Sequence, residues 1–156
     1  MSETDTDSSH PLDLRDPRQA GVYRVMRADV VPLMALAQDE FVAIHDIDLH
    51  GIDDKPALLV RIGEALQFPA GWGGNWDALA DALNDLSWLG EPTPRLLVWR
   101  GIDQLHARAP ELESTLCDIL EEASARWAAD GVAMWSLLSL AHIPDEDQEE
   151  DDVSSG

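Results

Sequence analysis

The stretch GWGGNWDALADAL, from Gly71 to Leu83, is the most informative part of this sequence. Three glycines within four residues allow a tight turn and a close approach to another surface. Asn75 follows them in a position to cap a helix, and apolar residues then recur at helical spacing. We therefore expect a glycine-rich loop that leads into a helix from about Asn75 to Leu86.

Three aspartates, Asp77, Asp81 and Asp85, follow one another four residues apart. Four residues advance around a helix axis by only about 40°, so the three carboxylates would form one stripe. Like charges at this spacing repel each other, and the dipole disfavours an anion near the end of a helix. The stripe is therefore either a solvated acidic face or a binding surface, and helix statistics alone do not separate the two.

Strand and helix patterns alternate around this stretch. Apolar runs of strand length occur at residues 41–49, 95–99 and 132–140. Apolar residues at helical spacing occur from about 55 to before Pro69, from 101 to about 106, and from Pro110 to about 129. This alternation predicts an α/β fold with a small, mainly parallel β-sheet of about three strands covered by helices. A strand at 23–25 and a helix at 28–37 would form an N-terminal extension.

The length and composition favour one domain between two acidic tails. The chain has 156 residues, of which 45% are hydrophobic, enough for a single core. Residues 1–20 and 144–156 are rich in Ser, Asp, Glu and Pro, with little to bury, so we expect both to be disordered. The domain would span residues 21–143, with its core in 41–140.

The charge balance indicates a basic partner. The sequence has 10 Lys and Arg against 31 Asp and Glu, a formal net charge of −21. Residues 21–143 alone keep 19 acids and 8 bases, so the acidity belongs to the domain itself. Such a surface repels nucleic-acid phosphates and anionic membranes, and it attracts a basic protein. We expect a basic protein partner and no direct binding to nucleic acid or membrane.

The sequence also indicates the cellular compartment of the protein. Cys117 is the only cysteine, which excludes an intramolecular disulfide and a multi-cysteine metal site. The first ten residues are acidic and polar, unlike a secretory signal, and the longest apolar stretch, near residues 132–141, is too short to span a bilayer. A reducing, cytoplasmic location is the expectation.

The stretch from Trp72 to Asp81 resembles the signature of the barstar family, bacterial inhibitors of secreted ribonucleases. That signature reads aromatic-Gly-x-Asn-x-Asp-Ala-Leu-x-Asp, and this chain has WGGNWDALAD. The preceding helix pattern, the RLLVWRG strand, the long helix with LEEA and the last apolar strand follow in the same order. The resemblance covers roughly residues 41–140.

In that family the signature loop and helix enter the ribonuclease active site, where carboxylates replace substrate phosphates. The resemblance implies that Asp81 is the central anchor and Asp77 its neighbour. It also implies that Trp72, Gly73 and Asn75 form the contacting loop.

A further carboxylate of the family corresponds to Glu122, with Glu121 as a rival one residue away. The chain would then be an inhibitor, monomeric when free, with no catalytic residue, cofactor or metal.

Two departures leave the partner open. Gly71 and Ala80 stand where the family inhibitor has aromatic residues. The alternative is therefore an antitoxin, immunity protein or regulator whose partner is not a ribonuclease. An enzyme that uses Asp77, Asp81 and Glu122 as a metal cluster is less favoured, because no histidine has metal-ligand spacing. Of the six tryptophans, we expect Trp72 to be exposed, with Trp88 as a second candidate.

Overall fold

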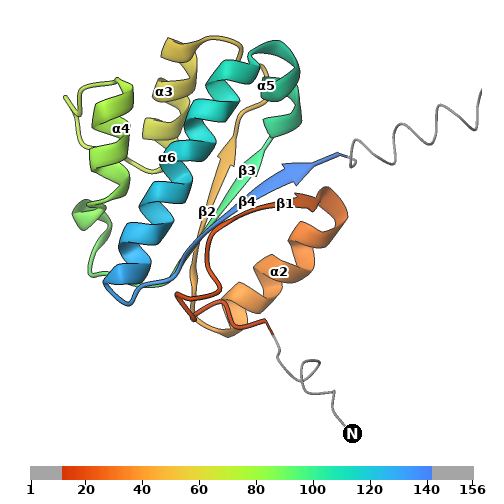
Figure 1. Ribbon diagram of the computed structural model, residues 1–156, viewed down its shortest axis with the longest axis vertical. Coiled ribbons are helices and arrows are strands. Elements are labelled where there is room, and N and C mark those ends of the chain that lie inside the picture. The colour runs from red at the N-terminus through yellow and green to blue at the C-terminus, as the bar shows by residue number, and fades with distance from the viewer. Residues whose placement is uncertain (1–11, 142–156) are drawn as a thin grey trace, which may run out of the picture.

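The computed structural model describes residues 12–141 and shows an α/β fold (Figure 1). One parallel sheet has the strand order β1-β4-β3-β2. Its strands are β1 (Val22–Met26), β2 (Ala43–Asp48), β3 (Arg95–Arg100) and β4 (Met134–Leu140). The helices are α2 (Arg27–Asp39), α3 (Lys55–Ala65), α4 (Trp76–Leu83), α5 (Ile102–Arg108) and α6 (Pro110–Ala129), with a short 3-10 helix η1 (Ser87–Leu89). The predicted α/β class and parallel sheet are confirmed, with four strands in place of about three.

Helices cover both faces of the sheet, so the molecule has two cores. In Figure 1, α3, α4, α5 and α6 lie on one side of the sheet and α2 on the other. Alternate strand residues point into the two cores, as the pleat requires. Leu97 and Trp99 of β3 pack in the larger core, whereas Leu96 and Val98 pack in the smaller core. The central strands β3 and β4 are therefore apolar almost throughout.

The N-terminal extension is part of the sheet. Val22 of β1 pairs with Ser136 of β4, and Met26 pairs with Leu140, in parallel register. Helix α2 then carries the chain across the second face to β2, at the opposite edge. The extension thus adds a fourth strand and covers the second face.

Residues 12–20 differ from the expected disordered tail. Leu14 is only 1% exposed, and its carbonyl oxygen accepts a hydrogen bond from Nε1 of Trp135 at 2.8 Å. The amide of Leu14 donates to Oε1 of Glu40 at 3.2 Å. Polar composition predicted disorder, but Leu14 packs in the smaller core, and Nη1 of Arg15 donates to the carbonyl oxygens of Glu40 and Phe41. The remainder of both expected tails, residues 1–11 and 142–156, lies outside the described residues.

Most predicted element boundaries hold, with one exception that affects the site. Oδ1 of Asp54 caps α3 by accepting from the amide of Ala57 at 2.9 Å, and α6 starts at Pro110 as expected. Helix α4 ends at Leu83, three residues earlier than predicted, because Leu86 takes a left-handed conformation with φ of 51°. None of the helices in residues 12–141 is both long and apolar enough to cross a bilayer.

Candidate protein-binding surface

Aromatic packing fixes the glycine-rich loop, residues 69–74, on the domain. The ring of Trp72 lies against Gly63 of α3, where a Cβ would come within 3.0 Å of Nε1 of the indole. Phe68 packs edge-on against Trp72, with ring centroids 4.8 Å apart, and against Trp88, with centroids 5.3 Å apart. The loop is therefore held before any partner arrives.

The expectation that Trp72 is exposed is wrong, and the same holds for Trp88. Both side chains are partly buried and pack against the larger core. Nε1 of Trp88 donates to the carbonyl oxygen of Leu66 at 3.0 Å. A burial signal was present in the sequence, because Gly63 interrupts a good helix without an obvious local reason. The partner of that glycine could not be identified without the fold.

The junction between the loop and α4 is also rigid. Oδ1 of Asn75 accepts the amide of Ala78 at 2.7 Å, which confirms the predicted helix cap. Gly73 has φ of 112°, and a Cβ there would lie 2.8 Å from Cβ of Ala78. This position therefore requires glycine. The exposed backbone around Gly73 and Asn75 remains open to contact.

The acidic side chains of α4 are exposed. Asp77 lies in the first turn, where the helix dipole favours an anion, and Asp81 follows one turn later. Within residues 12–141 neither carboxylate has an ion pair or a side-chain hydrogen bond. These carboxylates are therefore available to external cations without first losing a partner inside the protein.

Asp85 does not belong to the predicted stripe. It lies beyond the end of α4, and its Oδ2 accepts a hydrogen bond from the hydroxyl of Ser87 at 3.1 Å. The turn at Leu86 redirects the chain at this point. The stripe on the helix itself therefore consists of Asp77 and Asp81.

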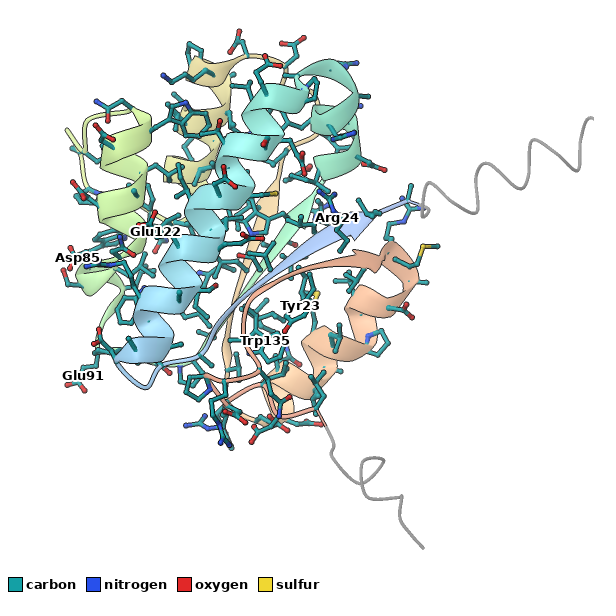
Figure 2. The ribbon with its side chains drawn as sticks, in the orientation of Figure 1. Tyr23, Arg24, Asp85, Glu91, Glu122 and Trp135 are labelled. Atoms are coloured by element: carbon teal, nitrogen blue, oxygen red, sulfur yellow. The ribbon has the colours of Figure 1, made fainter. Side chains whose placement is uncertain are left out.

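The structure separates the two candidate glutamates of α6. Arg126 lies four residues after Glu122, on the same stripe of the helix, and it lines a cleft with Asn84 at the end of α4. Glu121 lies on the opposite flank, near Cys117, whose thiol pKa is raised first by burial and Glu113 and to a smaller extent by Glu121. Figure 2 shows Glu122 on the same side of the molecule as Asp85. The α4 side of α6 thus carries Glu122.

One basic residue near α4 was not anticipated. Nζ of Lys55, at the start of α3, lies 5.6 Å from the centroid of the Trp76 ring, in a cation–π contact. Nothing in the sequence pattern indicates this contact, because it depends on how α3 and α4 lie beside each other.

Metal chemistry receives no support from the arrangement of these side chains. Among the residues that the structure describes, no three His, Cys, Asp or Glu side chains gather as an ion would need. Cys117 is partly buried, and burial followed by the nearby Glu113 raises the pKa of its thiol to about 12. The surface offers fixed negative charge on a rigid support, which suits recognition of cations.

Comparison with known protein families decides the relationship. The family model described as "Barstar (barnase inhibitor)" matches residues 42–139, more than half of the chain. This chain belongs to the barstar family. The described inhibitor role of barstar proteins is a binding function, and the matched region holds the loop, α4 and α6. Strand β1 and helix α2 precede the part matched to barstar. The comparison with curated proteins gave no match.

Proposed function

We propose that this chain inhibits a basic ribonuclease of the barnase type, in the cytoplasm of a bacterium, by placing the glycine-rich loop and α4 in the enzyme's active site. The observation that carries the proposal is the pair Asp77 and Asp81. Both are exposed and without an ion-pair partner in residues 12–141, and they lie within the part of the chain matched by the family described as barnase inhibitors.

Electrostatics supports this mode of binding. Ribonuclease active sites present cationic groups to substrate phosphates, and a carboxylate can take the place of a phosphate there. The net charge of −21 draws a basic protein toward the chain before contact. Within residues 12–141, no ion pair of Asp77 or Asp81 has to break before these carboxylates bind a cation.

Rigidity of the loop supports tight binding. Association is weakened when loops must be ordered at the interface, and this loop is ordered in advance. Trp72 fixes it against Gly63, and the Asn75 cap fixes its junction with α4. Trp72 therefore acts mainly by positioning Gly73 and Asn75, which are exposed.

The position of Glu122 supports it as a further contact. It lies on the α4 side of α6, whereas Glu121 lies on the other flank, and both side chains are exposed. A partner seated on α4 would reach Glu122 first. We assign Glu122 to the surface and leave Glu121 outside it.

A second candidate function rests on Gly71 and Ala80. These positions carry no aromatic surface, so the loop and helix lack contacts that another family member offers its enzyme. A different basic protein could be the target, with the chain acting as an antitoxin, immunity protein or regulator. The negative charge and the ordered loop favour binding of a ribonuclease and binding of another basic protein equally.

RNA cleavage assays test the main proposal. We would measure cleavage by barnase and by a set of other basic secreted ribonucleases with increasing amounts of the chain. Asp81→Ala is the test variant, and Glu121→Ala is the control that removes the same charge. We expect inhibition of at least one enzyme, and loss of several kcal/mol of binding for Asp81→Ala, on the scale known from the barnase–barstar pair.

Two outcomes would contradict the proposal. Full inhibition by Asp81→Ala would mean that the carboxylate is only solvated surface. No inhibition of any ribonuclease, together with tight capture of a different basic protein that depends on Asp81, would establish the second candidate in its place. Asp81→Ala should fold normally, because alanine favours a helix and the change relieves repulsion from Asp77.

A further inference from the structure

A cavity of about 970 Å³ opens at the carboxyl ends of the parallel strands. None of the residues that line it belongs to α4 or to the glycine-rich loop. The chain leaves β1 to cover one face of the sheet and leaves β3 to cover the other, and the end of β4 lies between them. In open α/β sheets, such a crevice at the carboxyl ends of the strands is where ligands bind.

Cationic side chains gather at this cavity in a strongly acidic protein. Three of the ten Lys and Arg residues line it, together with two of the five histidines. They are Arg24, Arg27, Arg100, His50 and His106. The acidic lining is Asp103, whose oxygens accept the amides of Gln104 and Ala141 at 3.0 and 3.1 Å.

A buried carboxylate contacts one of these arginines and one of these histidines. Glu113 of α6 is 4% exposed, and its Oε2 accepts from Nη2 of Arg24 at 2.8 Å. Its Oε1 lies 3.2 Å from Nδ1 of His106. Burial alone would raise the pKa of Glu113, but hydrogen bonds from Arg24, His106 and Cys117 lower it overall. Figure 2 labels Arg24, whose side chain remains 52% exposed beside this anchor.

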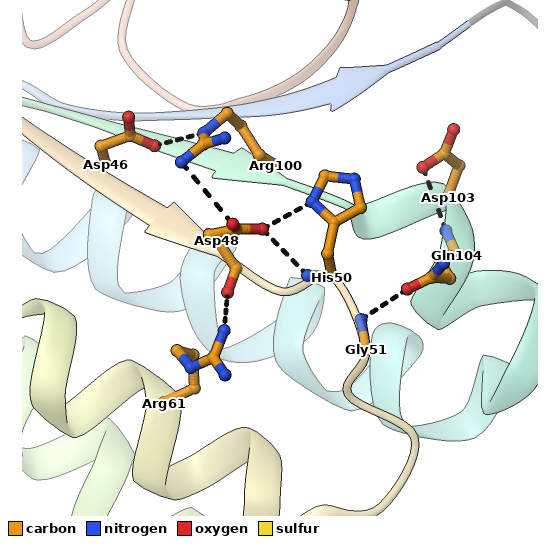
Figure 3. Close-up of polar contacts among 8 residues, drawn as sticks. All are labelled: Asp46, Asp48, His50, Gly51, Arg61, Arg100, Asp103 and Gln104. Carbon is orange, nitrogen blue, oxygen red and sulfur yellow. Dashed lines mark hydrogen bonds and ion pairs between the residues drawn. The ribbon is translucent and has the colours of Figure 1, made fainter.

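Carboxylates also orient the other side of the cavity, as Figure 3 shows. Nε of Arg100 donates to Oδ1 of Asp46 at 2.7 Å, and its Nη2 lies 3.8 Å from Asp48. Nδ1 of His50 lies 2.6 Å from the same Asp48. The side chain of Arg100 stays 42% exposed, so its remaining donors can reach a ligand. Its position is fixed before binding.

Arg27 differs from the other two arginines because it has no ion pair within residues 12–141. It is the first residue of α2, and no side chain caps that end of the helix. The positive end of the α2 dipole and the guanidinium therefore lie together at the cavity. Carboxylates behind Arg24 and Arg100 offset part of their charge, whereas within residues 12–141 no carboxylate forms an ion pair with Arg27.

We propose that this cavity binds a small molecule of nucleotide size that carries a phosphate group. Arginine forks suit phosphate oxygens, and Arg24 and Arg27 line the cavity from the end of β1 while Arg100 lines it from the end of β3. The volume far exceeds that of a bare phosphate and is typical of small-molecule sites. Leu140 and Ala107 in the lining offer contacts for the rest of such a molecule. This site is independent of the proposed ribonuclease inhibition.

Calorimetric titration of the full chain tests the site with three probes, adenosine 5′-monophosphate, inorganic phosphate and adenosine. We expect the monophosphate to bind at least about ten times more tightly than either fragment, because each fragment lacks one set of contacts. Arg27→Gln should weaken binding of the monophosphate about tenfold, since it removes a charge-assisted hydrogen bond. Arg108→Gln is the control, because Arg108 lies outside the cavity and is 3.8 Å from Asp53.

Three results would overturn the proposal. The first is no binding of the monophosphate, and the second is adenosine binding as tightly as the monophosphate. The third is that Arg27→Gln and Arg108→Gln weaken binding of the monophosphate equally. This would mean that non-specific electrostatic attraction, and not the cavity, accounts for the binding. Ribonuclease inhibition by Arg27→Gln, measured in parallel, should equal that of the unaltered chain, so failure of one proposal is distinguishable from failure of the other.

Discussion

The indole of Trp72 lies so close to Gly63 that a methyl group at this position of α3 would make an unusually tight contact with it. A Cβ at residue 63 would lie 3.0 Å from Nε1 and 3.3 Å from Cε2 of the indole. In an ordinary helix, replacing glycine by alanine stabilises by about 1 kcal/mol. Here the added methyl group requires the indole of Trp72 to shift by a few tenths of an ångström, which offsets that gain and disturbs the loop that Trp72 holds.

We therefore expect Gly63→Ala to give no gain in the free energy of unfolding and to weaken binding of the target ribonuclease. Val60→Ala, on the exposed side of the same helix, is the control. Thermal unfolding and binding affinity are measured on the same samples. A stabilisation of about 1 kcal/mol with unchanged affinity would show that Trp72 does not position the loop.

The two neighbouring glutamates of α6 allow a matched comparison. Glu122→Ala and Glu121→Ala remove the same charge, so they change long-range attraction equally. Only Glu122 lies on the α4 side, so we expect a faster dissociation of the ribonuclease complex for Glu122→Ala alone, by about tenfold. Surface plasmon resonance gives both rate constants. Equal dissociation rates would remove Glu122 from the binding surface.

Association with the target should slow steeply as salt is added. The net charge of −21 acts over distances that salt screens, because the Debye length falls from about 30 Å at 0.01 M to about 8 Å at 0.15 M. Stopped-flow mixing over this range measures the effect. The general phenomenon is best documented for barnase and barstar themselves. An association rate that does not change with salt would mean that the negative charge of this domain does not attract its partner over long distances.

Truncations can locate the true N-terminal boundary of the domain. A variant without residues 1–11 keeps all the contacts described for Leu14, whereas a variant without residues 1–20 loses them. Burial of one leucine and its two hydrogen bonds together contribute roughly 2–6 kcal/mol, so only the longer deletion should lower the free energy of unfolding by that amount. Urea titration of both variants measures it, and Leu14→Ala should reproduce most of the loss. Equal stability of the two truncated proteins would contradict the packing of residues 12–20.

His45 should make the stability depend on pH in mildly acidic solution. Burial, followed by the charge of Arg95, lowers the pKa of His45 from 6.5 to about 4, and Nε2 accepts from Nη1 of Arg95 at 2.9 Å. Between these two pKa values the unfolded chain binds a proton that the folded chain does not. The free energy of unfolding should therefore fall as the pH drops from 6.5 to 4.

His45→Gln keeps an acceptor for Arg95 and cannot titrate. Urea unfolding at several pH values should show the unaltered chain losing stability relative to His45→Gln across this window, with no such difference developing above it. Parallel curves for the two proteins would mean that His45 has the same pKa in both states.

Local patterns were sufficient for most elements of the fold. The helical stripe after Pro110 and the apolar runs at 95–99 and 132–140 predicted α6, β3 and β4 closely, because burial on a helix or a covered sheet leaves a direct periodic signal. The cap at Asn75 was equally clear, since it depends on only a few neighbouring residues.

Features that depend on segments far apart in the chain could not be predicted from the sequence. We predicted Asp85 as part of α4, because nothing about a leucine indicates the left-handed backbone conformation that Leu86 adopts. The cavity could not be predicted from the sequence, because only the order of the strands in the sheet brings Arg24 and Arg100 to the same cavity. Leu14 was assigned to a tail, because its partner Trp135 lies more than a hundred residues away.

The position of β4 inside the sheet has a consequence for synthesis on the ribosome. Strand β1 is among the first parts of the domain to be made, and its pairing partner β4 is the last. At about 5–20 residues per second, the interval between them is on the order of ten seconds. During that interval β1 has no neighbouring strand, and α2 lacks its contacts with β4. A nascent chain of this protein therefore cannot complete its fold progressively from the N-terminus, and the final strand closes both cores in one step.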